Sequence, residues 1–189
     1  RNLQPHSIWK RYQIEKSIKS IIMKKIFTLL FLLASFFAYS QSTTVVISQI
    51  YGGGGAPSAT TTFNCDYVEL HNISSTVQDI SGFKLAYGSS SGVLGSQQSN
   101  RFTFPANTTI PPGGYLLLAD SGLAGGANPQ LTVTRDFYFR FAMSATKGKI
   151  VLGTSALIDS ALLADQPAGA VVDFIGYGTA QEYEGAVAA

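Results

Sequence analysis

Covalent chemistry would have to come from very few side chains in this sequence of 189 residues. It contains two histidines and one cysteine, and of these only Cys65 and His71 follow residue 40. Nucleophilic catalysis needs a serine or cysteine within hydrogen-bond reach of a base, and a lone histidine at the end of an expected strand is more often structural. One cysteine and two histidines also exclude a Cys/His zinc cluster and an internal disulfide framework. We therefore expect no catalytic residue and no metal site built on these side chains.

Carboxylates are the remaining chemical resource, and ten of them follow residue 40. Two carboxylates held a few ångströms apart can hydrolyse a glycosidic bond, but the scattered spacing of these ten selects no pair. Oxygen ligands on loops suit Ca²⁺, so calcium is the one cofactor left open, although the sequence has no EF-hand loop and assigns no ligand. The ten carboxylates are Asp66, Glu69, Asp79, Asp120, Asp136, Asp159, Asp165, Asp173, Glu182 and Glu184.

A short aromatic and basic stretch is the best candidate for ligand binding. The segment 136–142 alternates, so its three phenylalanines would face the core while Tyr138 and Arg140 face outward together. An aromatic ring beside a guanidinium can stack on a nucleic-acid base or on a sugar. The basic residues that follow in the sequence would add positive charge. The candidate ligand-binding residues are therefore Tyr138, Arg140, Lys147 and Lys149, and the alternative is an ordinary strand exterior.

Four consecutive glycines, Gly52–Gly55, resemble part of a phosphate-binding loop. Such a loop needs a strand, then glycines, then a helix whose N-terminal amides hold the anion. No Gly-Lys-Ser/Thr sequence and no helical pattern follow here, because the chain continues through Ala56-Pro57-Ser58 and threonines into another expected strand. We expect a flexible surface loop between two strands.

Runs of β-branched and aromatic residues, separated by Gly, Pro, Ser and Asn, predict about eight short strands after residue 40. The expected strands are 43–51, 63–72, 82–87, 101–104, 115–119, 136–142, 149–152 and 170–177. This pattern is typical of an all-β protein, an antiparallel β-sandwich or barrel. The one helical candidate, 156–165, fits a loop equally well, and Cys65 is expected to be buried in a strand. Alternation assigns ten residues to the core: Val45, Ile47, Val68, Leu70, Leu116, Leu118, Ile150, Leu152, Val172 and Phe174.

The first forty residues differ from the rest in charge and hydropathy. Seven basic residues face one acid there, so this part carries +6, whereas residues 41–189 carry −4. Met23-Lys24-Lys25 precedes an apolar run over 26–37, and Ala-Tyr-Ser at 38–40 precedes Gln41. This order predicts a secretory signal peptide over 23–40, cleaved after Ser40, with 1–22 as upstream read-through or a disordered leader. The apolar run is shorter than the ~20 residues that span a membrane, so no stable membrane insertion is expected after cleavage.

Three segments of the mature region resemble one family in their order and spacing. They are VISQIYGGGG at 46–55, DYVELHN at 66–72 followed by ISGFKL at 80–85, and VDFIGYGTA at 172–180 followed by YEG at 183–185. Together with PPGGYL at 111–116, they resemble the bacterial lamin-tail domain, which is named after the immunoglobulin-like tail of nuclear lamins. The resemblance covers about residues 43–185 and implies an immunoglobulin-like antiparallel β-sandwich over 41–189, without catalytic residues.

The resemblance also implies a kind of role. In secreted bacterial proteins such domains typically sit beside a catalytic or surface-attachment region, frequently an extracellular nuclease. The leading hypothesis is a non-catalytic binding or spacer module of a secreted or cell-surface protein, accessory to a downstream region of the same polypeptide, with this chain as its N-terminal fragment. The alternatives are a self-standing adhesion or glycan-binding module and a small hydrolase. The candidate partners are the downstream domain, DNA and surface glycans, and the −4 charge of residues 41–189 argues against strong DNA binding.

Overall fold

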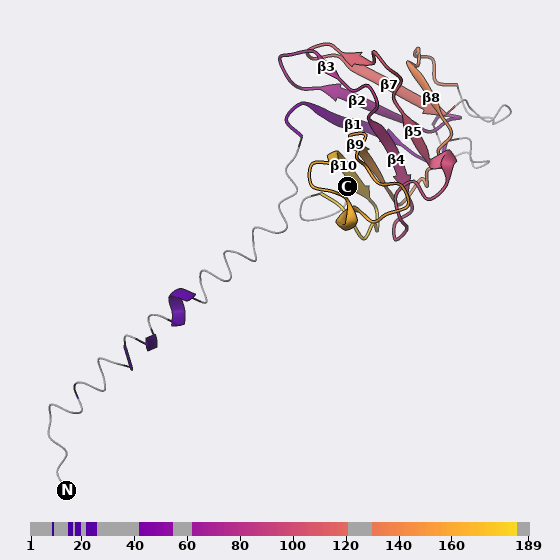
Figure 1. Ribbon diagram of the computed structural model, residues 1–189. Coiled ribbons are helices and arrows are strands. Elements are labelled where there is room, and N and C mark those ends of the chain that lie inside the picture. Colours follow the sequence, from indigo (N-terminus) through magenta and orange to yellow (C-terminus); the bar gives the residue numbers. More distant parts are fainter. Residues whose placement is uncertain are drawn as a thin grey trace, which may run out of the picture. The chain divides into compact units, whose positions relative to one another are not determined.

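The computed structural model of the chain describes residues 9, 15–16, 18–19, 22–25, 42–54, 62–120 and 130–184 (Figure 1). The chain divides into two units, Arg1–Ser40 and Gln41–Ala189. The described residues of the first unit are helical, and the apolar run of the expected signal peptide lies outside the described residues. In the part of the chain that the structure describes, none of the helices has the length and apolar character needed to cross a membrane. The second unit holds all the described strands and both hydrophobic clusters, so it contains its own core.

Eight strands of the second unit form two four-stranded sheets. The first sheet has the order β1 (Val45–Tyr51), β2 (Tyr67–Asn72), β7 (Tyr115–Asp120) and β8 (Phe137–Phe139). The second sheet has the order β10 (Val171–Tyr177), β9 (Gly148–Gly153), β4 (Lys84–Gly88) and β5 (Arg101–Thr103). These are the eight strands that the sequence predicts. The sequence pattern does not predict the small third sheet of β3 (Gln78–Asp79) and β6 (Thr109–Ile110), because two residues are too few to show alternation.

One strand pair departs from the expected antiparallel arrangement. β7 and β8 are parallel, with Leu118 beside Phe137 and Asp120 beside Phe139. A parallel pair requires a connection of about a dozen residues or more, and residues 121–136 provide one. β8 therefore adds a short parallel edge strand to an otherwise antiparallel sandwich.

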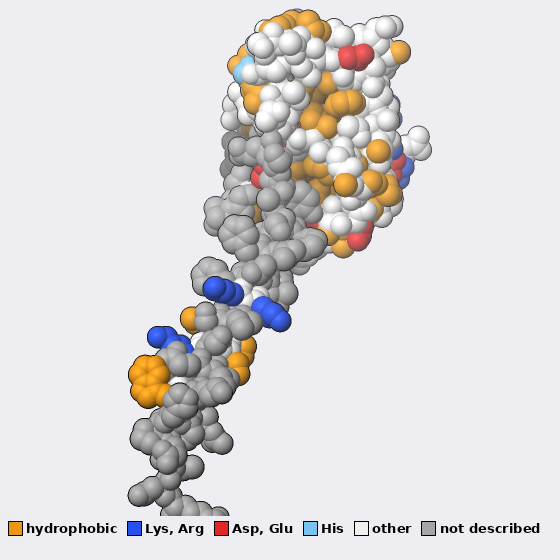
Figure 2. All heavy atoms as spheres, turned by 60° about the vertical axis from the view of Figure 1, so that its left-hand side comes forward, with side chains coloured by type: hydrophobic (Ala, Val, Ile, Leu, Met, Phe, Trp, Pro, Cys, Tyr) orange, Lys and Arg blue, Asp and Glu red, His pale blue; other side chains and the backbone are white. Residues whose placement is uncertain are grey.

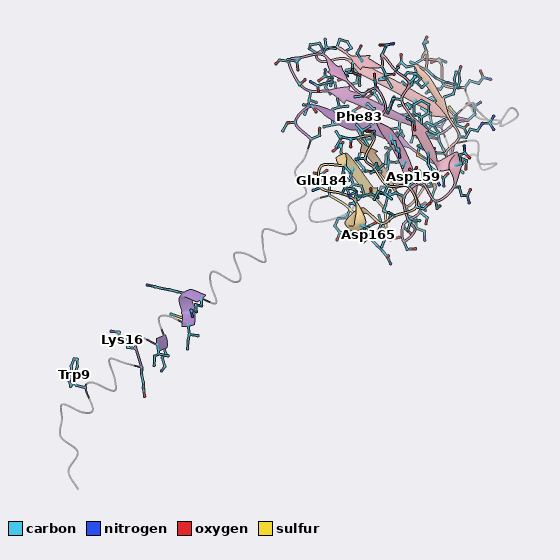
Figure 3. All side chains as sticks on the ribbon, viewed as in Figure 1. Trp9, Lys16, Phe83, Asp159, Asp165 and Glu184 are labelled. Atoms are coloured by element: carbon cyan, nitrogen blue, oxygen red, sulfur yellow. The ribbon has the colours of Figure 1, made fainter. Side chains whose placement is uncertain are left out.

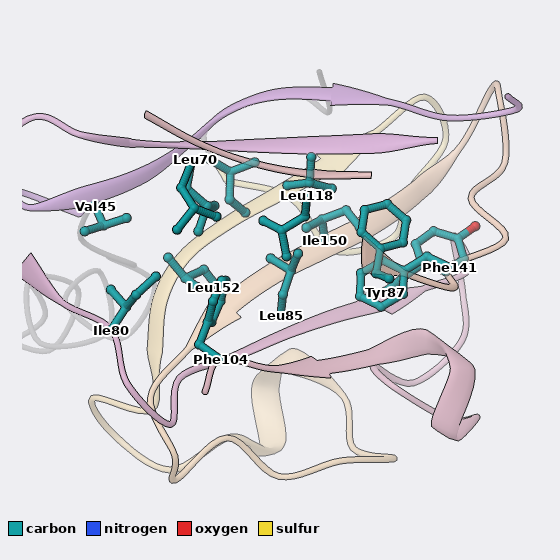
Figure 4. Close-up of a cluster of buried hydrophobic side chains, with 14 of the residues drawn as sticks. Val45, Leu70, Ile80, Leu85, Tyr87, Phe104, Leu118, Phe141, Ile150 and Leu152 are labelled. Carbon is teal, nitrogen blue, oxygen red and sulfur yellow. The ribbon is translucent and has the colours of Figure 1, made fainter. Parts of the chain in front are cut away.

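Alternating residues from both sheets meet in one hydrophobic core (Figure 4). Leu70 and Leu118 of the first sheet are fully buried against Leu85 and Ile150 of the second. Eight of the ten predicted core residues belong to this cluster, namely Val45, Ile47, Val68, Leu70, Leu116, Leu118, Ile150 and Leu152. Of the other two, Val172 packs partly buried against this cluster. Phe174 is buried but in a second cluster, so its predicted inward orientation is wrong, because the register of β10 shifts between Val171 and Asp173.

The second cluster lies on the outer face of the second sheet. Ala86 of β4 and Val151 of β9 alternate with inward-facing residues, yet both are almost completely buried. Leu94, from the connection after β4, packs there with Leu157 and Leu163, from the connection after β9. The second sheet is therefore covered by apolar side chains on both faces.

The structure decides two local expectations, the conformation of segment 156–165 and the environment of Cys65. The segment 156–165 is a loop that ends in the 3₁₀ helix η3 (Leu163–Asp165), and the side chain of Gln166 closes it by accepting from the amide of Ile158 at 2.7 Å and donating to its carbonyl at 2.9 Å. Another 3₁₀ helix, η2 (Gln98–Asn100), precedes β5. Cys65 is buried as expected but lies outside a strand, because the β1–β2 ladder ends at the pair Tyr51 and Tyr67.

Candidate ligand-binding face

The outer face of the first sheet carries aromatic side chains on neighbouring strands. The register places Tyr51 of β1 beside Tyr67 of β2. It also places Ala119 of β7 between Tyr67 and Tyr138 of β8. Because paired residues on adjacent strands point to the same side, these residues form one line across the sheet. We call Tyr51, Phe63, Tyr67 and Tyr138 the aromatic row, since Phe63 packs against its first two rings.

Ring contacts fix one end of the aromatic row. The rings of Tyr51 and Tyr67 are stacked with centroids 5.3 Å apart, and Phe63 meets them edge-on at 5.5 Å and 6.2 Å. The Tyr67 hydroxyl donates to Oε1 of Gln49 at 3.4 Å. These three aromatic side chains are half-buried, whereas Tyr138 at the other end is 62% exposed. The row therefore combines a rigid base with one accessible ring.

Arg135 connects the accessible ring to the neighbouring strand. Its guanidinium carbon lies 5.6 Å from the centre of the Tyr138 ring, and its Nη1 donates to the carbonyl of Asp120 at 3.0 Å. A guanidinium held over a tyrosine ring gains cation–π attraction and restricts the orientation of the ring. Arg135 and Tyr138 thus form a preorganised pair at the end of β7 and β8.

The four predicted ligand-binding residues do not lie together as one exposed group. Tyr138 and Arg140 are both exposed, on the outward-facing side that the alternation predicts. Lys147 is also exposed but precedes β9, in the other sheet. The guanidinium that contacts Tyr138 belongs to Arg135, which lies outside the predicted set because it comes before the alternating stretch.

Lys149 is not available to a ligand at the surface. Its side chain is fully buried within β9, and its ammonium pairs with the carboxylate of Glu182. The other carboxylate oxygen of Glu182 accepts from the backbone amide of Leu163 at 2.9 Å. Sequence reasoning placed Lys149 in an exposed basic group because nothing local indicates that the outer face of the second sheet is covered.

Comparison with known families decides the classification of the chain. The lamin tail domain family matches residues 38–179, which include the ten strands of the described part of the chain. The chain belongs to the lamin tail domain family. Its immunoglobulin-like sandwich agrees with this assignment and with the resemblance found in the sequence. No curated protein matches the chain.

The glycine run of this lamin tail domain has a packing role where the structure describes it. A Cβ on Gly52 would overlap the carbonyl of Ser144, and one on Gly54 would overlap the backbone of Cys65. Gly53 has a φ of +79° and donates from its amide to the carbonyl of Met143 at 2.9 Å. The expectation of a flexible surface loop is therefore wrong for 52–54, because only glycine permits this close approach of backbones. Gly55 lies outside the described residues.

A buried carboxylate joins the same loops of the lamin tail domain. Oδ1 of Asp66 accepts from the amide of Gly54 at 2.6 Å, and Oδ2 accepts from the amide of Met143 at 2.7 Å. Burial raises the pKa of Asp66 to about 6, although the two amide hydrogen bonds oppose this shift. Asp66 therefore links the backbone at Gly54 to the backbone at Met143, just before Tyr67 of the aromatic row. It forms a structural junction at the end of the first sheet.

The side chains that could perform catalysis in this lamin tail domain lie in surroundings that favour a structural role. His71 stacks on the ring of Tyr115 with centroids 4.1 Å apart, and burial raises the pKa of the Cys65 thiol, which disfavours the reactive thiolate. The segment 88–92 has the spacing Gly-x-Ser-x-Gly, but β4 leads there into a loop instead of the helix that a hydrolase elbow requires. Among the described residues, no three His, Cys, Asp or Glu side chains lie close enough to hold a metal ion.

Proposed function

We propose that this lamin tail domain is a non-catalytic binding module of an exported protein, and that it binds glycans on the outer face of its first sheet. The observation that carries the proposal is the aromatic row, with Tyr138 exposed and held by Arg135. Sugar rings have apolar faces that pack on aromatic side chains, while their hydroxyls need nearby hydrogen-bonding groups. Gln49 and Glu69, from β1 and β2, line the same side of the sheet.

Charge favours a neutral ligand over a nucleic acid. Residues 41–189 carry −4, and of the three basic residues in the predicted ligand-binding set, Lys149 is buried with Glu182. Figure 2 shows hydrophobic side chains gathered in patches on one face of the domain, with few charged side chains among them. A strong phosphate-binding surface would instead require several exposed cations in one place.

The proposed role is to hold a neighbouring region of the same protein close to a glycan surface. Support for export comes from the sequence over 23–40, and support for an accessory role comes from membership of the lamin tail domain family. In this role the domain supplies affinity, and any catalysis belongs to its neighbour.

Glycan binding is tested by comparing two exposed tyrosines of the first sheet. Residues 41–189 are applied to an array of bacterial surface glycans, and Tyr138→Ala is expected to weaken retention about tenfold because it removes a stacking surface. Tyr115→Ala is the matched control, since Tyr115 is similarly exposed at 59% but stacks on His71 away from the aromatic row. Equal losses in both variants, or no retention of the parent domain, would contradict the proposal.

DNA binding is the second candidate, favoured only by the pair of Arg135 and Tyr138, which could stack on a base. DNA binding would support an accessory role for the domain beside a nuclease. The test is binding to duplex and single-stranded DNA as the salt concentration is raised, because phosphate contacts weaken steeply with salt. Absence of binding at low salt removes this candidate, while binding that is lost with Arg135→Gln would favour it over glycan binding.

A further inference from the structure

A pocket of about 280 Å³ lies where β1 and β10 meet, at the opposite edge of the first sheet from β8. Its walls combine apolar side chains with polar groups, among them two carboxylates. The lining residues are Ser42, Val46, Ile47, Ile73, Asp173, Phe174, Ile175 and Glu184. None of these residues is basic and two are acidic, so the charge of the lining is complementary to a positively charged group.

The two carboxylates hold negative charge that the lining of the pocket does not neutralise. Oδ2 of Asp173 accepts from the amide of Ile47 at 2.6 Å, which fixes this side chain between the two edge strands. Burial raises the pKa of Asp173, and burial followed by the charge of Asp173 raises the pKa of Glu184. The ion pairs in the described part of the chain involve Asp159 and Glu182 instead. A cation in this pocket would offset the cost of burying the two carboxylates and the repulsion between them.

The chain itself can supply that cation. Ser42 lines the pocket, and the sequence predicts that the signal peptide is removed after Ser40. Cleavage there creates a new α-ammonium group on Gln41. Since consecutive Cα atoms are 3.8 Å apart, this group is one residue away from a side chain that already lines the pocket.

We propose that the pocket of Asp173 and Glu184 binds the α-ammonium of Gln41 after the leader is removed. The proposal rests on the export part of the proposed function, because the uncleaved chain has a peptide bond at this place. Capture of a terminal amine by converging acceptors is a known mode of peptide recognition. The mature N-terminus then joins the two edge strands of the sandwich.

Occupation of the pocket has a chemical consequence for an N-terminal glutamine. The free α-amine attacks its own side-chain amide carbon, the new C–N bond closes a five-membered lactam, and ammonia leaves. Only the unprotonated amine reacts, so an amine held as ammonium by two carboxylates is protected. An opposite charge close by shifts an ionisation by about one unit or more, which reduces the reactive form about tenfold.

The test measures this cyclisation in protein released from a fusion so that it begins at Gln41. Loss of ammonia is followed by intact mass for the parent domain, Asp173→Asn and Glu184→Gln, with Asp165→Asn as the matched control. Asp165 is exposed and lies away from Glu184, as the labels in Figure 3 show. We expect the two pocket variants to cyclise about tenfold faster than the parent and the control. Equal rates in all four proteins would overturn the proposal.

Two further measurements keep the result interpretable. If Asp173→Asn does not fold, Glu184→Gln carries the test, because the Glu184 side chain makes no hydrogen bond among the residues that the structure describes. One glycine added before Gln41 should lower the melting temperature of the parent but leave that of Glu184→Gln unchanged, and equal shifts would also overturn the proposal. The N-terminal residue of protein exported from the full chain is determined separately, so a failure of export is distinguished from a failure of docking.

Discussion

The outer faces of the two sheets differ in what covers them. On the second sheet, Ala86 and Val151 are buried beneath Leu94 and neighbouring leucines. On the first sheet, Ala119 is buried, but most of the other outward residues are at least partly exposed, and they include the aromatic row. A sheet buried on both faces contributes stability and leaves no room for a ligand, whereas a sheet with one open face can bind without disturbing the core. The covered face of the second sheet contributes stability, and the open face of the first sheet is where we propose ligand binding.

The largest effect should come from the charge buried under the second sheet's cover. Lys149→Met leaves the carboxylate of Glu182 without its ammonium partner, and we expect a loss of about 3 kcal/mol in the free energy of unfolding. Lys147→Met, at an exposed position two residues away, should change it by less than about 0.5 kcal/mol. Denaturant unfolding measures both. If both substitutions changed the free energy of unfolding by similar small amounts, the connections that cover the second sheet would not be closely packed in solution.

A matched pair of leucines compares the two faces directly. Leu94→Ala opens a cavity beneath the cover and should cost about 3 kcal/mol. Leu117→Ala removes a partly exposed side chain from the outer face of the first sheet and should cost about 1 kcal/mol. Urea unfolding curves with equal slopes give the difference. A cost for Leu117→Ala as large as that for Leu94→Ala would show that the first face is also covered.

The smallest effect concerns pH and the junction beside the aromatic row. Asp66 has a pKa of about 6 in the folded protein, above its ordinary value near 4, so the folded state binds the proton more tightly. Its contribution to stability is present at pH 4 and is lost as the pH rises through 6. Relative to Asp66→Asn, the parent should lose about 1 kcal/mol between pH 4 and pH 7, after allowance for solvent screening.

The location of this pH response sharpens the comparison. Asp66 joins Gly54 and Met143 next to the first sheet. Amide protection factors, corrected for the pH dependence of intrinsic exchange, should therefore fall there at higher pH, while those beneath the cover over Val151 stay unchanged. Asp165→Asn, at an exposed position, should leave the pH profile of the parent unchanged. An equal change in protection factors across both sheets would contradict a local junction.

Alternation along the strands was enough to predict the sandwich and most of its core. Val68 and Leu70 face inward with Tyr67 outward, and this period of two needs no tertiary information. The cover of the second sheet could not be found this way, since Leu94 and Leu157 come from connections with no period. The burial of Lys149, which points to the same outer face, could not be predicted for the same reason.

The candidate site was only partly predictable. Tyr138 follows from alternation, but its partner Arg135 does not, because their contact depends on the parallel register of β7 and β8. The glycine run was ambiguous in a different way. A glycine suits a flexible loop and a close backbone approach equally, and only the positions of Cys65 and Ser144 distinguish the two.

Ser42, before β1, and Glu184, after β10, line one pocket, so the two ends of the described sandwich lie close together. Chain segments attached before β1 and after β10 would leave from the same corner of the sandwich. Inserted into an exposed loop of another protein, the domain would keep the host's two chain ends close together, at little cost in loop-closure entropy. It would then project to one side of the host polypeptide and would add little to the distance between the flanking host segments.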